Sequence, residues 1–344
     1  MSPVPAGPGP GPGLGEQVAA LRHGAGAFPL GRDVFAVRGD DAGSYLQGQL
    51  SQDVAALGIG ATADSLLLQP DGKLTALLRV TRVDGRDFVL DTDAGFGDAL
   101  VARLKKFLLR SKVEIERLPW RGLALRGAEV GQAAAGLLTV LEEAGVLRLP
   151  FEWNGWSGID LLGPGDLILD RLPEGITACG RDAVEACRIV SGIPAMGSEL
   201  TDKTIAAEAG LVERTVSFTK GCYTGQELVA RLDARGNNVP RRLVGVVGGP
   251  DPEGDRLAFG MTLHAGEGPG NGPGDVAGPG DVATDKVVGT VTSATWSPEL
   301  TAWVALAYLH RTVDAPGPVR VRSGDGLGGS RPARVALLPL LGDP

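Results

Sequence analysis

The stretch that decides the fold is "TKGCYTGQELVAR", residues 219–231. It contains Cys222, one of three cysteines in 344 residues. The segment "TVSFT" (215–219) just before it alternates apolar and polar residues, as a half-buried strand does. Gly221 and Gly225 permit a tight turn. The stretch therefore predicts a strand followed by a turn that carries the cysteine.

The second half of the stretch predicts a helix. Thr224 and Glu227 have the spacing of a capping box, which starts a helix over about 225–235. Cys222 then precedes a helix N-terminus, where amides and the helix dipole favour negative charge, and Lys220 adds a cation nearby. These features predict a reactive thiolate. A small buried packing residue is the alternative that the sequence leaves open.

The other candidate reactive residues have weaker settings. Cys187 lies in "AVEACRIV", a helical apolar pattern that predicts a core position, and Cys179 has no comparable motif. His23 and His264 are expected at the surface, and His310 is expected to end a strand. A Cys–His dyad has no positive support in the sequence.

Composition and charge restrict the function classes. The formal charge of −8 disfavours a broad nucleic-acid footprint and direct tRNA binding. A local basic cluster is expected to be a solvated helix face or a contact site, and it consists of Lys105, Lys106, Arg110 and Lys112. Sparse cysteines without zinc-ligand spacing indicate a reducing compartment. Without a secretory signal or an apolar run of membrane length, we expect a cytoplasmic protein.

The order of apolar patterns predicts an α+β body. "SLLLQPDGKLTALLRV" (65–80) predicts two strands around a Pro-Asp-Gly turn, and 86–93 predicts a third strand. Residues 95–111 predict a helix whose apolar face is formed by Leu100, Leu104, Phe107 and Leu108. After Pro240 the chain consists of short β-rich segments separated by turns, which predicts an antiparallel barrel or sandwich.

Several of these segments resemble a known family. "KGCYTGQE" (220–227) resembles the signature of the YgfZ family, folate-binding proteins of iron–sulfur cluster assembly and repair. "YLQGQLSQDVAAL" (45–57) and "SGIPAMGSEL" (191–200) are similar to other family segments. Residues 291–309 are similar to the barrel of the related T-protein of glycine cleavage, an aminomethyltransferase. The likeness covers roughly residues 28 to 340.

The resemblance implies a three-domain ring around a central channel. Two α+β domains with ferredoxin-like elements would be joined to a C-terminal antiparallel β-barrel. The expected division is a disordered Pro/Gly tail at 1–24, a first α+β domain from 25–60 and 155–238 that carries the motif, a second at 61–154, and a barrel at 240–344 with a disordered loop at 266–281.

The resemblance also implies a binding site for tetrahydrofolate or a one-carbon derivative. Glu199 matches the glutamate that holds the pterin ring, since a carboxylate accepts paired N–H bonds from such an edge. Tyr223 and Trp296 are expected as aromatic walls, Gln226 as a further contact, and Cys222 as the catalytic thiol. The residues expected to support the motif are Lys220, Gly221, Thr224, Gly225, Glu227 and Arg231.

One departure from the T-protein pattern bears on activity. Ala76 and Leu77 occupy the positions of an aspartate pair that includes the T-protein catalytic acid, and neither side chain transfers protons. We therefore expect a folate-binding accessory factor that serves iron–sulfur client or assembly proteins, including tRNA-modifying enzymes. One cysteine does not hold a cluster alone, so no stable metal or cluster is expected. A one-carbon transferase and a non-enzymatic folate-binding scaffold are the alternatives.

Overall fold

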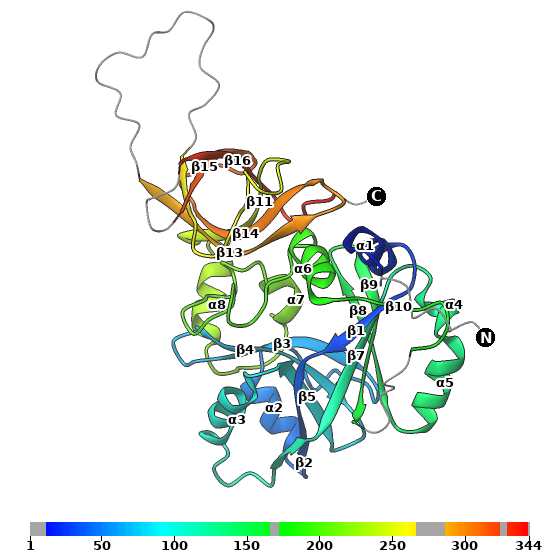
Figure 1. Cartoon of the computed structure of the whole chain (residues 1–344). Coiled ribbons are helices and arrows are strands. Elements are labelled where there is room, and N and C mark those ends of the chain that lie inside the picture. The colour runs from blue at the N-terminus through cyan, green and yellow to red at the C-terminus, as the bar shows by residue number, and fades with distance from the viewer. Residues whose placement is uncertain (1–11, 166–171, 266–285, 324–328, 343–344) are drawn as a thin grey trace, which may run out of the picture.

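The protein is built from two five-stranded sheets and a six-stranded closed barrel (Figure 1). The computed structural model describes residues 12–165, 172–265, 286–323 and 329–342. Two α+β sheets with a C-terminal antiparallel barrel confirm the predicted fold class. No helix among the described residues is long and apolar enough to cross a membrane.

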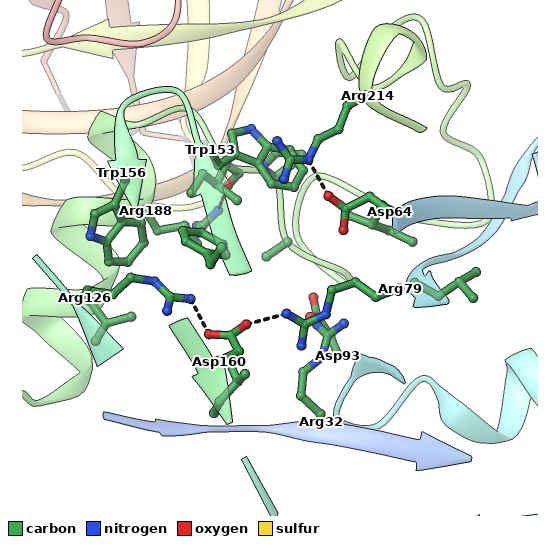
Figure 2. Close-up of a pocket in the computed structure, with 18 of the residues that line it drawn as sticks. Arg32, Asp64, Arg79, Asp93, Arg126, Trp153, Trp156, Asp160, Arg188 and Arg214 are labelled. Atoms are coloured by element: carbon green, nitrogen blue, oxygen red, sulfur yellow. Dashed lines mark hydrogen bonds and ion pairs between the residues drawn. The ribbon is translucent and has the colours of Figure 1, made fainter. Parts of the chain in front are cut away.

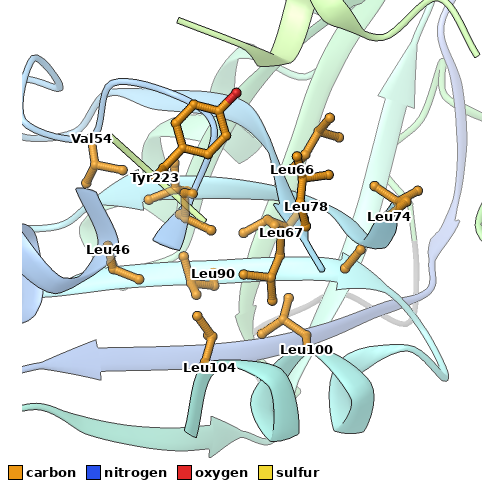
Figure 3. Packing of buried hydrophobic residues seen from close by; sticks show 14 of the residues in the cluster. Leu46, Val54, Leu66, Leu67, Leu74, Leu78, Leu90, Leu100, Leu104 and Tyr223 are labelled. Carbon is orange, nitrogen blue, oxygen red and sulfur yellow. The ribbon is translucent and has the colours of Figure 1, made fainter. Parts of the chain in front are cut away.

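The first sheet has the strand order β3-β4-β5-β2-β6 and is antiparallel throughout. Two helices cover it, and leucines of α3 pack against leucines of the strands (Figure 3). Tyr45 of α2 donates its hydroxyl proton to the carbonyl of Leu104 at 2.6 Å. The elements are β2 Arg32–Arg38, α2 Ala42–Gln49, β3 Thr62–Leu68, β4 Leu74–Arg82, β5 Phe88–Asp93, α3 Gly97–Lys105 and β6 Glu114–Leu118.

The second sheet has the order β10-β1-β7-β9-β8, in which only the β10–β1 pair is parallel. Helix α6 lies between this sheet and the barrel, and it packs against α1 and against β13 and β14. The elements are α1 Leu14–Arg22, β1 Gly26–Leu30, β7 Trp120–Arg126, α4 Val130–Ala133, α5 Ala135–Glu143, β8 Leu147–Trp153, β9 Trp156–Pro164, β10 Thr177–Ala178 and α6 Arg181–Val190.

The barrel closes in the order β11-β14-β13-β12-β15-β16. Ile189 and Val190 of α6 pack on Val304 and Leu306 of the barrel, which joins the barrel to the body. Two short helices, α7 Val212–Thr215 and α8 Gln226–Asp233, precede it. Its strands are β11 Arg241–Val247, β12 Thr262–Ala265, β13 Val287–Ser297, β14 Ala302–His310, β15 Gly317–Arg322 and β16 Arg331–Ala336.

Sheet membership crosses the expected domain division. β2 lies within the expected first domain but pairs with β5, and β7 lies within the expected second domain but pairs with β1. The chain thus alternates between the two sheets. The expected tail is wrong for α1, because Val18 and Leu21 are buried against the second sheet and α6. Residues 1–11 and the expected loop at 266–281 lie outside the described residues.

Two local predictions are also wrong. The expected strand at 215–219 is replaced by the last residue of α7 and an irregular segment, because Ser217 donates its amide to Ser51 instead of joining a ladder. The expected helix at 95–111 ends at Lys105, and Phe107 is 42% exposed instead of buried. Of the four residues predicted for the apolar face, only Leu100 and Leu104 are fully buried.

Candidate functional site

A cavity of about 200 Å³ lies where the two sheets face each other (Figure 2). Its walls are mainly apolar and aromatic, and its floor and rim carry charged side chains. Strands of both sheets, α6 and the segment around α7 all contribute. The apolar and aromatic wall includes Phe151, Trp153, Trp156 and Leu77.

The floor of the cavity begins with one buried carboxylate shared by two arginines. Asp160 of β9 lies 2.7 Å from Nη2 of Arg126 and also pairs with Arg79 (Figure 2). Burial alone would raise the pKa of Asp160, but the two guanidiniums lower it below its ordinary value. The Arg126 guanidinium also lies 3.6 Å from the centroid of the Phe151 ring, and its Nε has no hydrogen-bond partner among the described residues.

The row of ion pairs continues on the first sheet. Arg79 donates to Asp91 at 2.9 Å, and Arg32 donates from Nε to the same carboxylate at 2.6 Å. Arg32 also pairs with Asp93, whose other oxygen accepts the amide of Met196 at 3.1 Å. Burial would raise the pKa of Asp91, yet Arg32 and Arg79 lower it. Asp91 and Asp160, whose pKa values the arginines lower, stay ionised and paired, so they are poor proton donors.

One side of the cavity is formed by a stacked pair. Arg214 lies in α7 and donates from Nε to Asp64 of β3 at 2.5 Å. Its guanidinium lies 4.2 Å from the centroid of the half-buried Trp153 ring at the end of β8. Three elements from different parts of the chain therefore meet at this edge and present an indole face to the cavity.

Glu199 does not line the central cavity, and it lies instead against a separate pocket between the barrel and residues 198–204. It is 1% exposed, and both carboxylate oxygens are occupied. Oε2 accepts from Arg188 and from the amide of Ala195, both at 3.0 Å, while Oε1 accepts from Ser293 of the barrel at 2.6 Å. Arg188 of α6 lines the cavity. Direct contact between Glu199 and a ligand stays a prediction, and the geometry favours an effect through Arg188.

The lysine of the 220–227 motif acts as a clamp. Lys220 donates all three ammonium protons to backbone carbonyls, to Gln47 and Leu50 at 2.6 Å and to Gln52 at 2.9 Å. Burial lowers its pKa to about 8. The clamp ties the motif to the 45–57 segment that the sequence also singled out. The ammonium is thus engaged with these carbonyls instead of the Cys222 thiol.

Other motif residues also have structural tasks. Gly225 has φ +86°, and a Cβ there would lie 2.5 Å from the carbonyl oxygen of Gln69. Tyr223 is 8% exposed, with its ring in the core of the first sheet (Figure 3). Gln226 accepts the Tyr223 amide at 3.0 Å, and Thr224 donates its amide to a carbonyl of α2.

The predicted capping box is wrong. Helix α8 begins at Gln226 with Gly225 as its N-cap, and no side chain caps it. Thr224 therefore lies one residue too early, and Glu227 is exposed in the first turn. A left-handed glycine has replaced the hydroxyl cap because the chain must turn against Gln69 at this point.

Cys222 is exposed, whereas Cys179 and Cys187 are buried. Cys222 lines a shallow surface pocket together with Phe218, Lys220 and Gln226. Burial raises the pKa of Cys179, and it raises the pKa of Cys187 to about 12. The core position predicted for Cys187 is confirmed.

The remaining expected residues are spread over the molecule. Gly221 is exposed beside Cys222, and Arg231 is exposed in the last turn of α8. Trp296 lies on the barrel against Trp303, away from the central cavity among the described residues. Within the same residues, no histidine lines the Cys222 pocket. The surface position predicted for His264 is wrong, because it is 7% exposed within β12.

Sequence reasoning missed the side chains that form the cavity. Trp153 and Trp156 flank an Asn-Gly turn between β8 and β9, so two of the five tryptophans fall within four residues. That clustering was a usable signal for an aromatic wall. Arg188 and Arg214 give no such signal, because their roles depend on partners far along the chain.

Comparisons with known proteins show which families the chain is similar to. Residues 241–341 match the family described as the glycine cleavage T-protein C-terminal barrel domain. An uncharacterized protein of Haemophilus influenzae is 31% identical over 59% of this chain and 66% of its own length. The tRNA-modifying protein YgfZ of Edwardsiella ictaluri is 33% identical over 59% of this chain and 65% of its own length.

Other relatives match over more of the chain at lower identity. An aminomethyltransferase of Streptomyces avermitilis is 27% identical over 93% of this chain and 87% of its own length. The crystal structure of glycine cleavage system aminomethyltransferase T from Bartonella henselae shows the same fold, with a TM-score of 0.74 at 22% identity over 96% of this chain and 90% of that one. The family match thus covers the barrel, and over longer stretches the chain is similar both to YgfZ-like proteins and to aminomethyltransferases, which these matches do not separate.

Proposed function

We propose that the protein binds a reduced folate in the central cavity and uses Cys222 as the working thiol of an accessory factor for iron–sulfur cluster assembly or repair. One observation carries the proposal. The turn is held by hydrogen bonds and close contacts of Lys220, Tyr223, Gly225 and Gln226. The cysteine at its centre is exposed. An exposed thiol on a turn that several other residues hold in place is a candidate for chemistry with an external partner.

The cavity has the chemistry that a pterin ring requires. Trp153 offers an aromatic face, and Leu77 lies on the wall. Arg126 keeps a buried Nε without a partner among the described residues, a donor for an acceptor edge. Arg188 and Arg214 supply further N–H groups at the rim. When bound, a reduced folate would supply a carrier for one-carbon groups, and these residues would position its ring.

The same cavity is poorly equipped for aminomethyl transfer. Leu77 lines it at one of the two positions where the T-protein resemblance places its aspartates, and Ala76 is buried behind. The carboxylates that do line it are Asp64, Asp93 and Asp160, and each forms an ion pair with an arginine. General acid catalysis needs a carboxyl that can hold a proton near neutral pH, and the arginines that lower the pKa of Asp160 oppose this for the buried carboxyl of the floor.

Cys222 would act as a nucleophile or a transient ligand toward an iron–sulfur client. Its thiolate would donate an electron pair to iron, with the partner supplying the other ligands, or attack one sulfur of a partner disulfide, whose other sulfur leaves as a thiolate. Within the described residues, no group of three or more His, Cys, Asp or Glu side chains is arranged to hold a metal. In this proposal the cluster is cargo that belongs to a client. Tetrahydrofolate bound in the cavity would mark the state in which the factor is active.

Calorimetric titration with tetrahydrofolate tests the first half of the proposal. Trp153→Ala should weaken binding by roughly tenfold or more, since loss of an aromatic stack and its burial amounts to about 1–3 kcal/mol. Trp296→Ala is the matched control and should bind like the wild type. Equal affinities for both variants, or loss only in Trp296→Ala, would move the folate out of this cavity.

An aminomethyltransferase is the second candidate, because relatives with that name align with 93% of the chain. Formation of methylenetetrahydrofolate from aminomethylated donor protein tests it. Turnover that persists in Cys222→Ser would favour the transferase. A non-enzymatic scaffold would instead bind folate, show no turnover and tolerate loss of the thiol in cells.

A further inference from the structure

The end of helix α3 carries a buried guanidinium without a carboxylate partner. Arg103 is 3% exposed and donates Nε to the carbonyl of Leu68 at 3.0 Å and Nη1 to Gln49 at 3.2 Å. Its Nη2 has no hydrogen-bond partner, and among the described residues no carboxylate pairs with it. Burial lowers the pKa of this guanidinium. A buried cation without an anion is costly, so the site lacks one negative group.

Further cations surround this position. Lys105, Lys106 and Arg110 follow within one or two turns, are exposed, and show no ion pair in the described part of the chain. Lys112 differs, since its ammonium lies 3.9 Å from Asp40. A chain with a formal charge of −8 therefore concentrates four uncompensated cations at one helix end.

Two apolar side chains stand among these cations. Phe107 is 42% exposed with its ring 4.4 Å from the Arg103 guanidinium, and Leu109 is 83% exposed. Leu104 turns inward and Leu108 is partly buried against the same core. The outward pair has no core to pack on. Aromatic and arginine side chains with an apolar centre and a charged rim are typical of protein–protein contacts.

We propose that the α3 end surface, defined by Arg103, Lys105, Lys106, Phe107, Leu109 and Arg110, docks a carboxylate-rich segment of a partner protein that also carries apolar side chains. The surface is small, which fits a short segment and a transient complex. Charge complementarity selects acidic groups. The unpartnered Nη2 of Arg103 is itself buried beside the Phe107 ring, so it would reach a docked carboxylate only when that ring moves aside. This surface is separate from the Cys222 pocket and does not depend on folate binding.

A nucleic acid would fit this surface less well. Phosphate backbones bind through many released counterions, and four cations on an acidic protein give a weak footprint. Leu109 would also remain in water beside a phosphate backbone, whereas a protein segment can cover it. An acidic peptide is therefore the better probe of the site.

Fluorescence anisotropy with a labelled peptide of glutamate and leucine tests the proposal on the full chain. The wild type should bind this peptide more tightly than a matched peptide with glutamine in place of glutamate. Lys106→Glu and Leu109→Ser should each weaken binding by about tenfold, the scale of one lost charged or apolar contact. The control variants Arg181→Glu and Ile59→Ser alter an exposed cation and an exposed apolar residue elsewhere, and they should bind like the wild type.

Arg103→Met separates recognition from a structural role. If Arg103 serves an anion, Met should abolish peptide binding while the melting temperature stays the same or rises, because removal of a lone buried charge is often stabilising. A lower melting temperature with unchanged peptide affinity would overturn the proposal. So would absence of peptide binding at millimolar concentration, equal binding by Lys106→Glu, or tighter binding of a single-stranded oligonucleotide than of the acidic peptide.

Discussion

Replacement of Lys220 by methionine tests whether the motif is a structural clamp. The ammonium donates to the carbonyl of Gln47 in the last turn of α2 and to those of Leu50 and Gln52 just after this helix. Charged hydrogen bonds contribute about 1.5–3 kcal/mol each, or roughly 5 kcal/mol for the set at the lower end. Burial opposes this, because it lowers the pKa of Lys220 to about 8 and so disfavours the charged ammonium.

The expected net loss is therefore about 2 kcal/mol in the free energy of unfolding at neutral pH. Urea denaturation of Lys220→Met measures it, with the exposed Lys203→Met as the matched control. An unchanged midpoint in Lys220→Met would show that the clamp contributes nothing. Because the lysine also fixes the turn that displays Cys222, alkylation of this thiol should become less uniform in the variant.

The pH dependence has a definite sign. The pKa of Lys220 is lower in the folded than in the unfolded chain, so the unfolded chain holds this proton more tightly. The lysine's contribution to stability therefore rises as pH increases from about 8 toward 10.5. The stability difference between wild type and Lys220→Met should widen over this range, and a difference that narrows would contradict the assignment.

Three other predictions concern the cavity and the thiols. Glu199→Gln should weaken tetrahydrofolate binding by about tenfold by loosening Arg188, whereas Glu185→Gln, which alters the more exposed partner of the same arginine, should have less effect; calorimetry decides between them. Cys222 should react with iodoacetamide well before Cys179 and Cys187, which are buried and have raised pKa values, and equal rates by mass spectrometry would contradict its display. Asp91→Asn should leave Arg32 and Arg79 undercompensated and destabilise the chain by about 3 kcal/mol in urea denaturation, and a loss below about 1 kcal/mol would show that the row of ion pairs is not needed.

The parts of the fold that could be predicted are those with local signals. The β3–β4 hairpin follows from apolar runs around a Pro-Asp-Gly turn, and α6 follows from a helical apolar period. The barrel strands are short apolar runs between turns. Helix α1 was missed because its start is hidden in a Pro/Gly-rich stretch, although its apolar residues are buried against the body.

The candidate site could be predicted only in part, because most of it depends on distant partners. Cys222 was found from a motif, but the role of Lys220 depends on carbonyls about 170 positions earlier in the chain. Glu199 was expected in the cavity, yet Ser293 of the barrel and Arg188 occupy its oxygens. The alternating arginines and aspartates lie on five strands, and only the folded sheets bring them into one row.

The most direct measurement is complementation of a strain that lacks an iron–sulfur assembly factor of this type, scored by the activity of an iron–sulfur enzyme. Wild type and Cys179→Ser should restore activity. Cys222→Ser should fold, bind tetrahydrofolate normally and fail to restore it. Full restoration by Cys222→Ser would contradict the claim that the motif exists to display this thiol.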